Sequence, residues 1–282
     1  MSPGRLRAAL EIALLLVVLV PRGTLGQGLQ DYSLVAEEDG QWRLPRLLRE
    51  LSGLAWASGD RLFGHDDERA VIYEIDYREG RVIKGFAMGD PPERRDFEGI
   101  AVVGERFYLV TSSGRIYESR EGADGDRMLY NTYRTGVGEF CEVEGLEFEP
   151  SDRTLLMLCK TVRGDEDLED FIVIFRWSLA EREVTGPPLL VPVAPLREMI
   201  DSRTIHPSGI ARHPTSGHYF IVAAREGALV EITPDGEVVG GVQLDQRVHR
   251  QTEGIAFTSD GTLFLADEGG NRRARLTLYR PR

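Results

Sequence analysis

The sequence is poor in cysteine and in basic residues, and both shortages narrow the range of functions. Only two cysteines, Cys141 and Cys159, occur among 282 residues. Lysine and arginine together number 34 against 46 acidic residues, which gives a net charge of −12 at pH 7. Such a surface repels nucleic-acid phosphates and anionic lipid headgroups, so we expect no nucleic-acid partner. Cations are the expected partners.

Several common catalytic and metal-binding signatures are also missing. No G-x-S-x-G nucleophile elbow occurs, and Ser208 lies instead in His206-Pro207-Ser208-Gly209. Gly269-Gly270-Asn271 follows a predicted strand and opens no helix, which indicates a turn rather than a phosphate-binding loop. None of the five histidines has the spacing of a zinc motif: His65, His206, His213, His218 and His249.

A long hydrophobic run occurs only at the N-terminus. Arg5 and Arg7 precede an apolar stretch over residues 8–20, interrupted only by Glu11, and residues 21–26 follow with the small residues Thr24 and Gly26 before the expected cleavage point. This order predicts a signal peptide over residues 1–26 and a mature domain over 27–282. The stretch would cover roughly 20 Å as a helix, short of the ~30 Å core of a bilayer. We therefore expect a periplasmic or secreted protein, with an uncleaved inner-membrane anchor as the alternative.

The two cysteines lie close together on one predicted hairpin. If residues 150–153 form its turn, the register places Cys159 opposite Glu144, three residues from Cys141. An exported chain meets an oxidising compartment in which two such thiols can pair. The sequence leaves open a disulfide and two separate thiols.

What the sequence does contain is a five-residue phrase, with Ser or Glu at its second position and Gly at its third, that occurs five times, at residues 51–55, 97–101, 143–147, 207–211 and 252–256. The steps between its central glycines are 46, 46, 64 and 45 residues, a period typical of one four-stranded propeller blade. Short apolar runs separated by turns follow each phrase and predict four strands per repeat. The predicted fold is all-β, a five-bladed β-propeller. The glycines are Gly53, Gly99, Gly145, Gly209 and Gly254.

Two irregularities bear on how the ring closes. The last repeat ends after three strands, at residues 276–279, while residues 32–36 form an unpaired candidate strand. Pairing of these ends would complete the last blade and remove two exposed sheet edges. The 64-residue step contains a predicted loop at 163–167 and a predicted short helix at 196–200. A degenerate sixth blade in this step is the alternative.

The polar position of the phrase predicts a ring of oxygen atoms at one mouth of the central channel. Carboxylates ~6 Å apart at an effective dielectric of ~20 would repel by about 3 kcal/mol, so the ring would keep protons or take up a cation. More than four hard oxygen ligands suit calcium. The alternative is a turn signature whose carboxylate accepts backbone N–H bonds. The five residues are Ser52, Glu98, Glu144, Ser208 and Glu253.

The second strands of the first and last repeats add four acidic residues, which the hairpin registers place at the same mouth. These repeats are neighbours in a closed ring, so they bias the predicted calcium site toward one side. The matching positions in the other repeats are not acidic. The four residues are Asp66, Asp67, Asp267 and Glu268.

The same motifs resemble those of the bacterial SdiA-regulated family over roughly residues 45–282, and more distantly phytase-like esterase and NHL-type propellers. The resemblance implies a five-bladed propeller that is exported or membrane-anchored, with a calcium site and no established reaction. Ser52 and Ser208 depart from a pure Glu-Gly repeat and exclude a symmetric ring of five carboxylates. The motifs are Glu50-Leu51-Ser52-Gly53-Leu54-Ala55, His65-Asp66-Asp67-Glu68, Asp96-Phe97-Glu98-Gly99-Ile100-Ala101, Glu144-Gly145-Leu146 and Thr252-Glu253-Gly254-Ile255-Ala256.

The sequence therefore favours an exported, monomeric, calcium-binding propeller that binds or senses a small molecule or a protein. The alternative is a metal-dependent hydrolase of a phosphoester, ester or lactone, with the cation in the channel. A scaffold whose only ligand is its ion is the third possibility.

Overall fold

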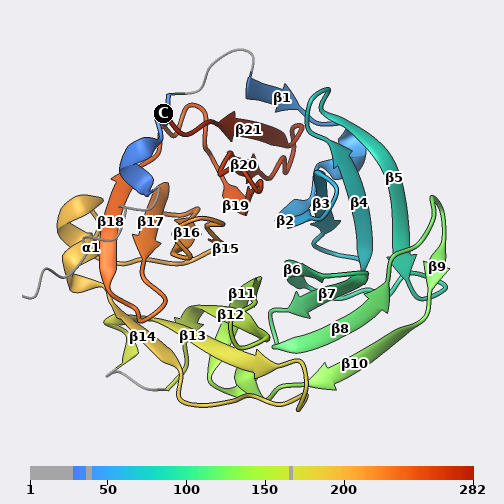
Figure 1. The fold of residues 1–282 in the computed structure, drawn as a ribbon, viewed down its shortest axis with the longest axis horizontal. Coiled ribbons are helices and arrows are strands. Elements are labelled where there is room, and N and C mark those ends of the chain that lie inside the picture. Colours follow the sequence, from blue (N-terminus) through green and yellow to red (C-terminus); the bar gives the residue numbers. More distant parts are fainter. Residues whose placement is uncertain (1–27, 36–39, 165–167) are drawn as a thin grey trace, which may run out of the picture.

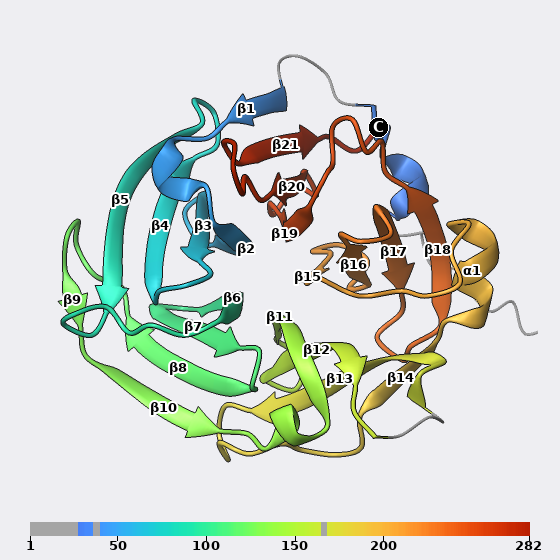
Figure 2. The same ribbon diagram turned by 180° about the vertical axis from the view of Figure 1, so that it is seen from behind.

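The computed structural model describes residues 28–35, 40–164 and 168–282, so the predicted signal peptide lies outside the described residues. Five β-sheets stand around a central channel like the blades of a propeller (Figure 1). In both views the innermost strands are β2, β6, β11, β15 and β19 (Figure 2). The predicted five-bladed fold is confirmed. In the described part of the chain, no helix is long and apolar enough to cross a membrane.

The blades follow one another along the chain. Blade 1 contains β2 (Leu51–Ala57), β3 (Arg61–Asp66), β4 (Val71–Asp76) and β5 (Arg81–Met88), with β9 (Arg127–Met128) added in parallel at its edge. Blade 2 contains β6 (Phe97–Val103), β7 (Arg106–Thr111), β8 (Arg115–Arg120) and β10 (Tyr130–Arg134). Blade 3 contains β11 (Cys141–Glu149), β12 (Thr154–Val162), β13 (Phe171–Ser178) and β14 (Leu189–Pro192).

The remaining two blades complete the circle. Blade 4 contains β15 (Gly209–Arg212), β16 (Tyr219–Ala223), β17 (Ala228–Ile232) and β18 (Val238–Gln243). Blade 5 contains β19 (Thr252–Phe257), β20 (Leu263–Asp267), β21 (Arg275–Tyr279) and β1 (Gln41–Arg43). The helices are short: η1 (Leu29–Asp31), η3 (Arg46–Leu48), η4 (Val137–Glu139) and α1 (Ala194–Met199).

A strand from the N-terminal side closes the ring, although it is not the predicted one. β1 pairs antiparallel with β21, with Trp42 opposite Leu276. The assignment of the closing strand to residues 32–36 was wrong. Tyr32 makes a single bridge to Pro281, its ring is buried among side chains of blades 4 and 5, and its hydroxyl donates to Gly261 O at 2.5 Å. Residues 36–39 lie outside the described residues.

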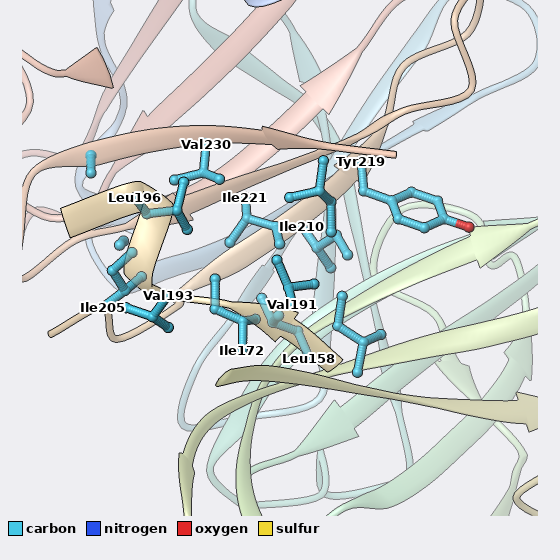
Figure 3. Close-up of a cluster of buried hydrophobic side chains, with 14 of the residues drawn as sticks. Leu158, Ile172, Val191, Val193, Leu196, Ile205, Ile210, Tyr219, Ile221 and Val230 are labelled. Carbon is cyan, nitrogen blue, oxygen red and sulfur yellow. The ribbon is translucent and has the colours of Figure 1, made fainter. Parts of the chain in front are cut away.

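The long third step contains no sixth blade in the part of the chain that the structure describes. Its extra residues include α1, which contacts β18 at the outer side of blade 4 (Figure 1). Leu196 and Ile205 from this segment join the apolar core between blades 3 and 4 (Figure 3). The predicted helix is thus confirmed, beginning at Ala194 rather than 196. The predicted loop falls partly on residues 165–167, outside the described residues.

Cys141 and Cys159 form a disulfide, with their Cα atoms 5.7 Å apart. The predicted register was one residue in error, because an irregularity in β11 places Cys159 opposite Val143 rather than Glu144. Of the two alternatives that the sequence left open, the disulfide is the one observed.

The glycine of the phrase lets the innermost strands of neighbouring blades approach closely. A Cβ atom on Gly99 would lie 2.5 Å from the backbone nitrogen of Leu146, in the next blade. A Cβ atom on Gly209 would lie 2.3 Å from Glu253 O. Backbone atoms cannot move aside as a flexible side chain can, so only glycine fits at these positions. The close approach brings the polar residues of adjacent phrases to one small area.

Candidate metal centre

β-bulges position the polar residue of the phrase in four of the five blades. In blade 1, Leu51 pairs with Asp66 and Gly53 with His65, which leaves Ser52 as the extra residue. The same shift isolates Glu98 in β6 and Glu253 in β19. In β11, two residues, Glu144 and Gly145, oppose one. A bulge turns a side chain out of the regular alternation of a strand, which here frees it from the blade interior.

The three ring glutamates are brought together at the channel mouth. Burial, followed by the charges of Glu144, Asp96 and Glu253, raises the pKa of Glu98 to about 9. Burial likewise raises the pKa of Glu144 to about 7, although Lys160 opposes the shift from 2.7 Å away. The pKa of Glu253 is also raised by burial. Three neighbouring carboxyl groups with raised pKa values do not all ionise at neutral pH. They form a site where a bound cation would replace protons.

The two ring serines are differently placed. Ser208 donates its hydroxyl to Thr252 O at 2.8 Å and accepts a hydrogen bond from the backbone N–H of Ala224 at 2.9 Å. This hydroxyl therefore ties blade 4 to blade 5. Ser52 is buried and its hydrogen bond lowers the pKa of Glu253, which places it beside that carboxyl group. Ser52 is the serine that remains close to the carboxylates.

Two of the four second-strand acidic residues are already paired. Asp66 is buried and forms an ion pair with Arg69 at 2.8 Å. Asp267 accepts hydrogen bonds from Thr252 Oγ1 at 3.0 Å and lies 2.9 Å from His249 Nδ1. Both residues hold the ends of their strands in place, and neither joins the cluster described next.

The tightest group of carboxylates is formed by Glu50, Asp67 and Glu268, which we call the acidic triad. One oxygen atom from each lies within 4.8 Å of the others. Asp67 Oδ1 is buried and has no hydrogen-bond partner among the described residues. Burial first, then the neighbouring carboxylates, raises the pKa of Asp67 to about 6 and that of Glu268 to about 8. The geometry thus leaves an unsatisfied oxygen in a strongly negative place.

Gln251 joins the acidic triad to the ring of glutamates. Its side-chain amide donates to Glu253 Oε1 at 3.0 Å and also to Glu268. The two sets are therefore parts of one polar mouth between blades 1 and 5. A narrow cavity of about 10 Å³ is lined by three of the ring residues, Ser52, Glu98 and Glu253, and by apolar residues that include Leu54, Ile100 and Ile255. A space of that size holds about one water molecule, so a ligated cation would sit at the mouth.

Sequence reasoning missed Glu50, Gln251 and Lys160. Glu50 and Gln251 each lie two residues before the polar position of their phrase, and this fixed offset is the signal that could have identified them. Lys160 occupies the second-strand position that Asp67 and Glu268 occupy in blades 1 and 5, and it pairs with Glu144 on the blade 3 side. The residues two before the polar position are Glu50, Asp96, Glu142, His206 and Gln251.

The SdiA-regulated family model matches residues 196–280 of this chain. The resemblance inferred from the motifs is confirmed over these residues, which cover blade 4 and most of blade 5. No curated protein matches the chain.

Solved structures with a similar fold are propeller enzymes of low sequence identity. Glutaminyl cyclase from Myxococcus xanthus has a TM-score of 0.59 and 16% identity, covering 85% of this chain and 93% of the enzyme. Aldose sugar dehydrogenase from Streptomyces coelicolor, in its PQQ-bound form, has a TM-score of 0.54 and 16% identity, covering 82% and 94%. A luciferin-regenerating enzyme has a TM-score of 0.51 and 9% identity, covering 85% and 92%. At these identities the likeness concerns the fold alone.

Proposed function

We propose that the protein is an exported β-propeller that binds calcium at the channel mouth between blades 1 and 5 and uses this mouth to bind or sense a ligand. The observation that carries the proposal is the acidic triad, in which Asp67 Oδ1 is buried without a hydrogen-bond partner among the described residues. Three carboxylates so close together favour protons or a cation, and a divalent ion neutralises them at neutral pH.

Calcium is the ion that suits these donors. The candidate ligands offer only oxygen: the carboxylates of Glu50, Asp67 and Glu268, with the carboxylate of Glu253 close by. Calcium takes six to eight oxygen ligands in flexible geometry, whereas zinc prefers nitrogen and sulfur. Bound there, the ion would supply positive charge that attracts an anionic or carbonyl group of a ligand.

Two further observations support the remaining parts of the proposal. The Cys141–Cys159 disulfide suits an oxidising compartment, in keeping with a secreted or periplasmic protein, soluble or held by an uncleaved anchor. The negative net charge suits a cationic ligand and disfavours nucleic acid. We propose a monomer whose further partner is a small molecule or a protein.

A calcium titration of residues 27–282 by calorimetry tests the proposal. Asp67→Asn and Glu268→Gln should each weaken calcium binding at least tenfold, because each removes a charged ligand. Glu105→Gln, an exposed residue in the turn after β6, is the control and should bind as the parent does. Binding of parental strength in the Asp67→Asn/Glu268→Gln double variant would refute the site. Glu98→Gln tests whether the ion lies on the channel axis instead. An ion held by the acidic triad predicts that Glu98→Gln weakens calcium binding less than Asp67→Asn or Glu268→Gln does.

A metal-dependent hydrolase is the second candidate. The observation that favours it is Glu268, a member of the acidic triad, because burial and the neighbouring carboxylates raise its pKa to about 8, which suits proton transfer near neutral pH. Screening phosphoesters, esters and lactones with calcium and with a chelator separates the two candidates. Turnover that requires calcium, and that disappears in Glu268→Gln even at a calcium concentration that saturates this variant, would establish the hydrolase.

A further inference from the structure

The opposite mouth of the channel holds a separate pocket of about 350 Å³. The inner strands run from the acidic mouth to this one, so it is lined by residues near the ends of those strands and by the turns that follow. Its lining includes Ala55, Ala211 and Ala256, each the fifth residue of its phrase. The repeat therefore builds a second ring of equivalent positions here, distinct from the acidic mouth.

Two members of this second mouth break the repeat with charges of opposite sign. The fifth residue of the phrase is alanine in four blades and Glu147 in blade 3. The residue that follows the phrase is Arg212 in blade 4 and is apolar in the other four blades, where it is Trp56, Val102, Phe148 or Phe257. Glu147 and Arg212 line the same pocket, from the neighbouring strands β11 and β15.

Neither side chain is fully satisfied within the protein, and burial raises the pKa of Glu147 to about 8, although the Arg212 charge opposes the shift. Glu147 Oε1 accepts a hydrogen bond from the backbone N–H of Phe148 at 2.9 Å, but the carboxyl group enters no ion pair in the part of the chain that the structure describes. Arg212 forms an ion pair with Glu149 at 3.3 Å, yet its buried Nε has no hydrogen-bond partner among the same residues. A ligand ammonium group beside Glu147 would favour the ionised carboxylate, and a ligand acceptor could use the guanidinium donors that Glu149 leaves free, so both groups are suited to a ligand.

Aromatic side chains line the same pocket as the two charged residues. Trp56 and Phe148 line the pocket and are both partly exposed. The Trp56 ring is held by Phe264, stacked at 6.0 Å between centroids, and by Tyr77 at 5.5 Å. A platform fixed in this way binds an apolar or aromatic group without ordering new side chains.

We propose that this second mouth binds a small zwitterion of the amino-acid type with an aromatic or apolar side group. Its ammonium group pairs with Glu147, its carboxylate accepts hydrogen bonds from the Arg212 guanidinium, and its side group lies against Trp56 and Phe148. A fixed pair of opposite charges selects a ligand that carries both over one that carries either. The site stands whether or not the acidic mouth binds calcium.

Calorimetry with three probes, in the presence of a chelator, tests the assignment. The probes are L-phenylalanine, 2-phenylethylamine, which lacks the carboxylate, and 3-phenylpropionate, which lacks the ammonium group. L-Phenylalanine should bind at least tenfold more tightly than either. Glu147→Gln should weaken L-phenylalanine and 2-phenylethylamine but not 3-phenylpropionate, and Arg212→Gln should weaken L-phenylalanine and 3-phenylpropionate only.

Matched control variants separate a specific loss of binding from a general effect of removing a charge. Glu105→Gln and Arg120→Gln remove an exposed acidic and an exposed basic group in blade 2 and should leave all three affinities unchanged. Glu147→Ala gives blade 3 the residue of the other four blades, so it should fold and still lose the amine-bearing probes. Equal affinity for the three probes, no binding of any at millimolar concentration, or unchanged binding in the folded Glu147→Ala variant would overturn the assignment.

Discussion

At the scale of single residues, the glycine and the polar residue of the phrase do different work. Glycine allows adjacent blades to touch, and the β-bulge beside it frees the polar side chain from the blade. The sequence shows both residues recurring together, so spacing alone identifies Glu98, Glu144 and Glu253 as neighbours in space. It cannot separate the packing role from the chemical one, because the two residues are adjacent at every repeat.

Gly99→Ala tests the packing role. The added methyl group would clash with the backbone of Leu146, which cannot move aside as a flexible side chain can. We therefore expect the free energy of unfolding to decrease by about 1–3 kcal/mol. Gly240→Ala in β18 is the control, since its Cβ would lie 3.6 Å from a Leu29 methyl group, an ordinary contact. Urea unfolding of both variants measures the difference. Equal stability of the two would show that the blades can separate slightly at no cost.

At the scale of elements, strands with strong patterns are predictable from the sequence and short ones are not. Residues 70–75 and 228–232 show apolar runs between turns, and they correspond to β4 and β17. β1 has only the three residues Gln41–Arg43, too few to show any periodicity. The sequence pattern therefore favours the longer segment that begins at Tyr32 as the closing strand. The disulfide register failed for a similar reason, because a bulge in β11 cannot be read from composition.

The candidate site was likewise predictable only where a repeat or a strand pairing fixes a residue's position. The ring glutamates and the acidic residues Asp67 and Glu268 follow from repeat spacing and hairpin register. Glu50 was missed because it precedes the strand, where no hairpin partner indicates its position, and only the folded chain brings it to Asp67. The pairing of Asp66 with Arg69 was also invisible, since adjacent acidic residues look equivalent in a sequence.

Removal of β1 tests closure of the ring. Deleting residues 27–44 should leave the edge of β21 unpaired, and we expect aggregation or loss of a single cooperative unfolding transition. Light scattering and thermal melting measure the two effects. Tyr32→Phe, which keeps the buried ring and loses only the hydroxyl, should unfold cooperatively and serves as the control. A truncated chain that melts like the parent would contradict closure by β1.

At the scale of the whole molecule, buried carboxyl groups make stability depend on pH and on cations together. Glu98, Glu144 and Glu268 have pKa values raised to about 9, 7 and 8, above the ordinary 4.5. The folded state therefore holds protons that the unfolded chain has released in this window. Proton linkage then requires that the stability of the calcium-free protein falls as pH rises from about 5 to 9.

The last prediction follows from replacing those protons by an ion. In a chelator, the free energy of unfolding should decrease steadily from pH 5 to pH 9, and Glu98→Gln should flatten the decrease, since one such carboxyl accounts for up to about 1.4 kcal/mol per pH unit. Saturating calcium, at about 100 times its dissociation constant, should add roughly 2.7 kcal/mol and reduce the pH dependence, because the ion takes the place of the protons. Urea unfolding at five pH values, with calcium and with chelator, measures both effects. Stability that rises with pH in the chelator would mean that the mouth carboxylates are already neutralised by groups within the fold, and the electrostatic basis for a cation site would fail.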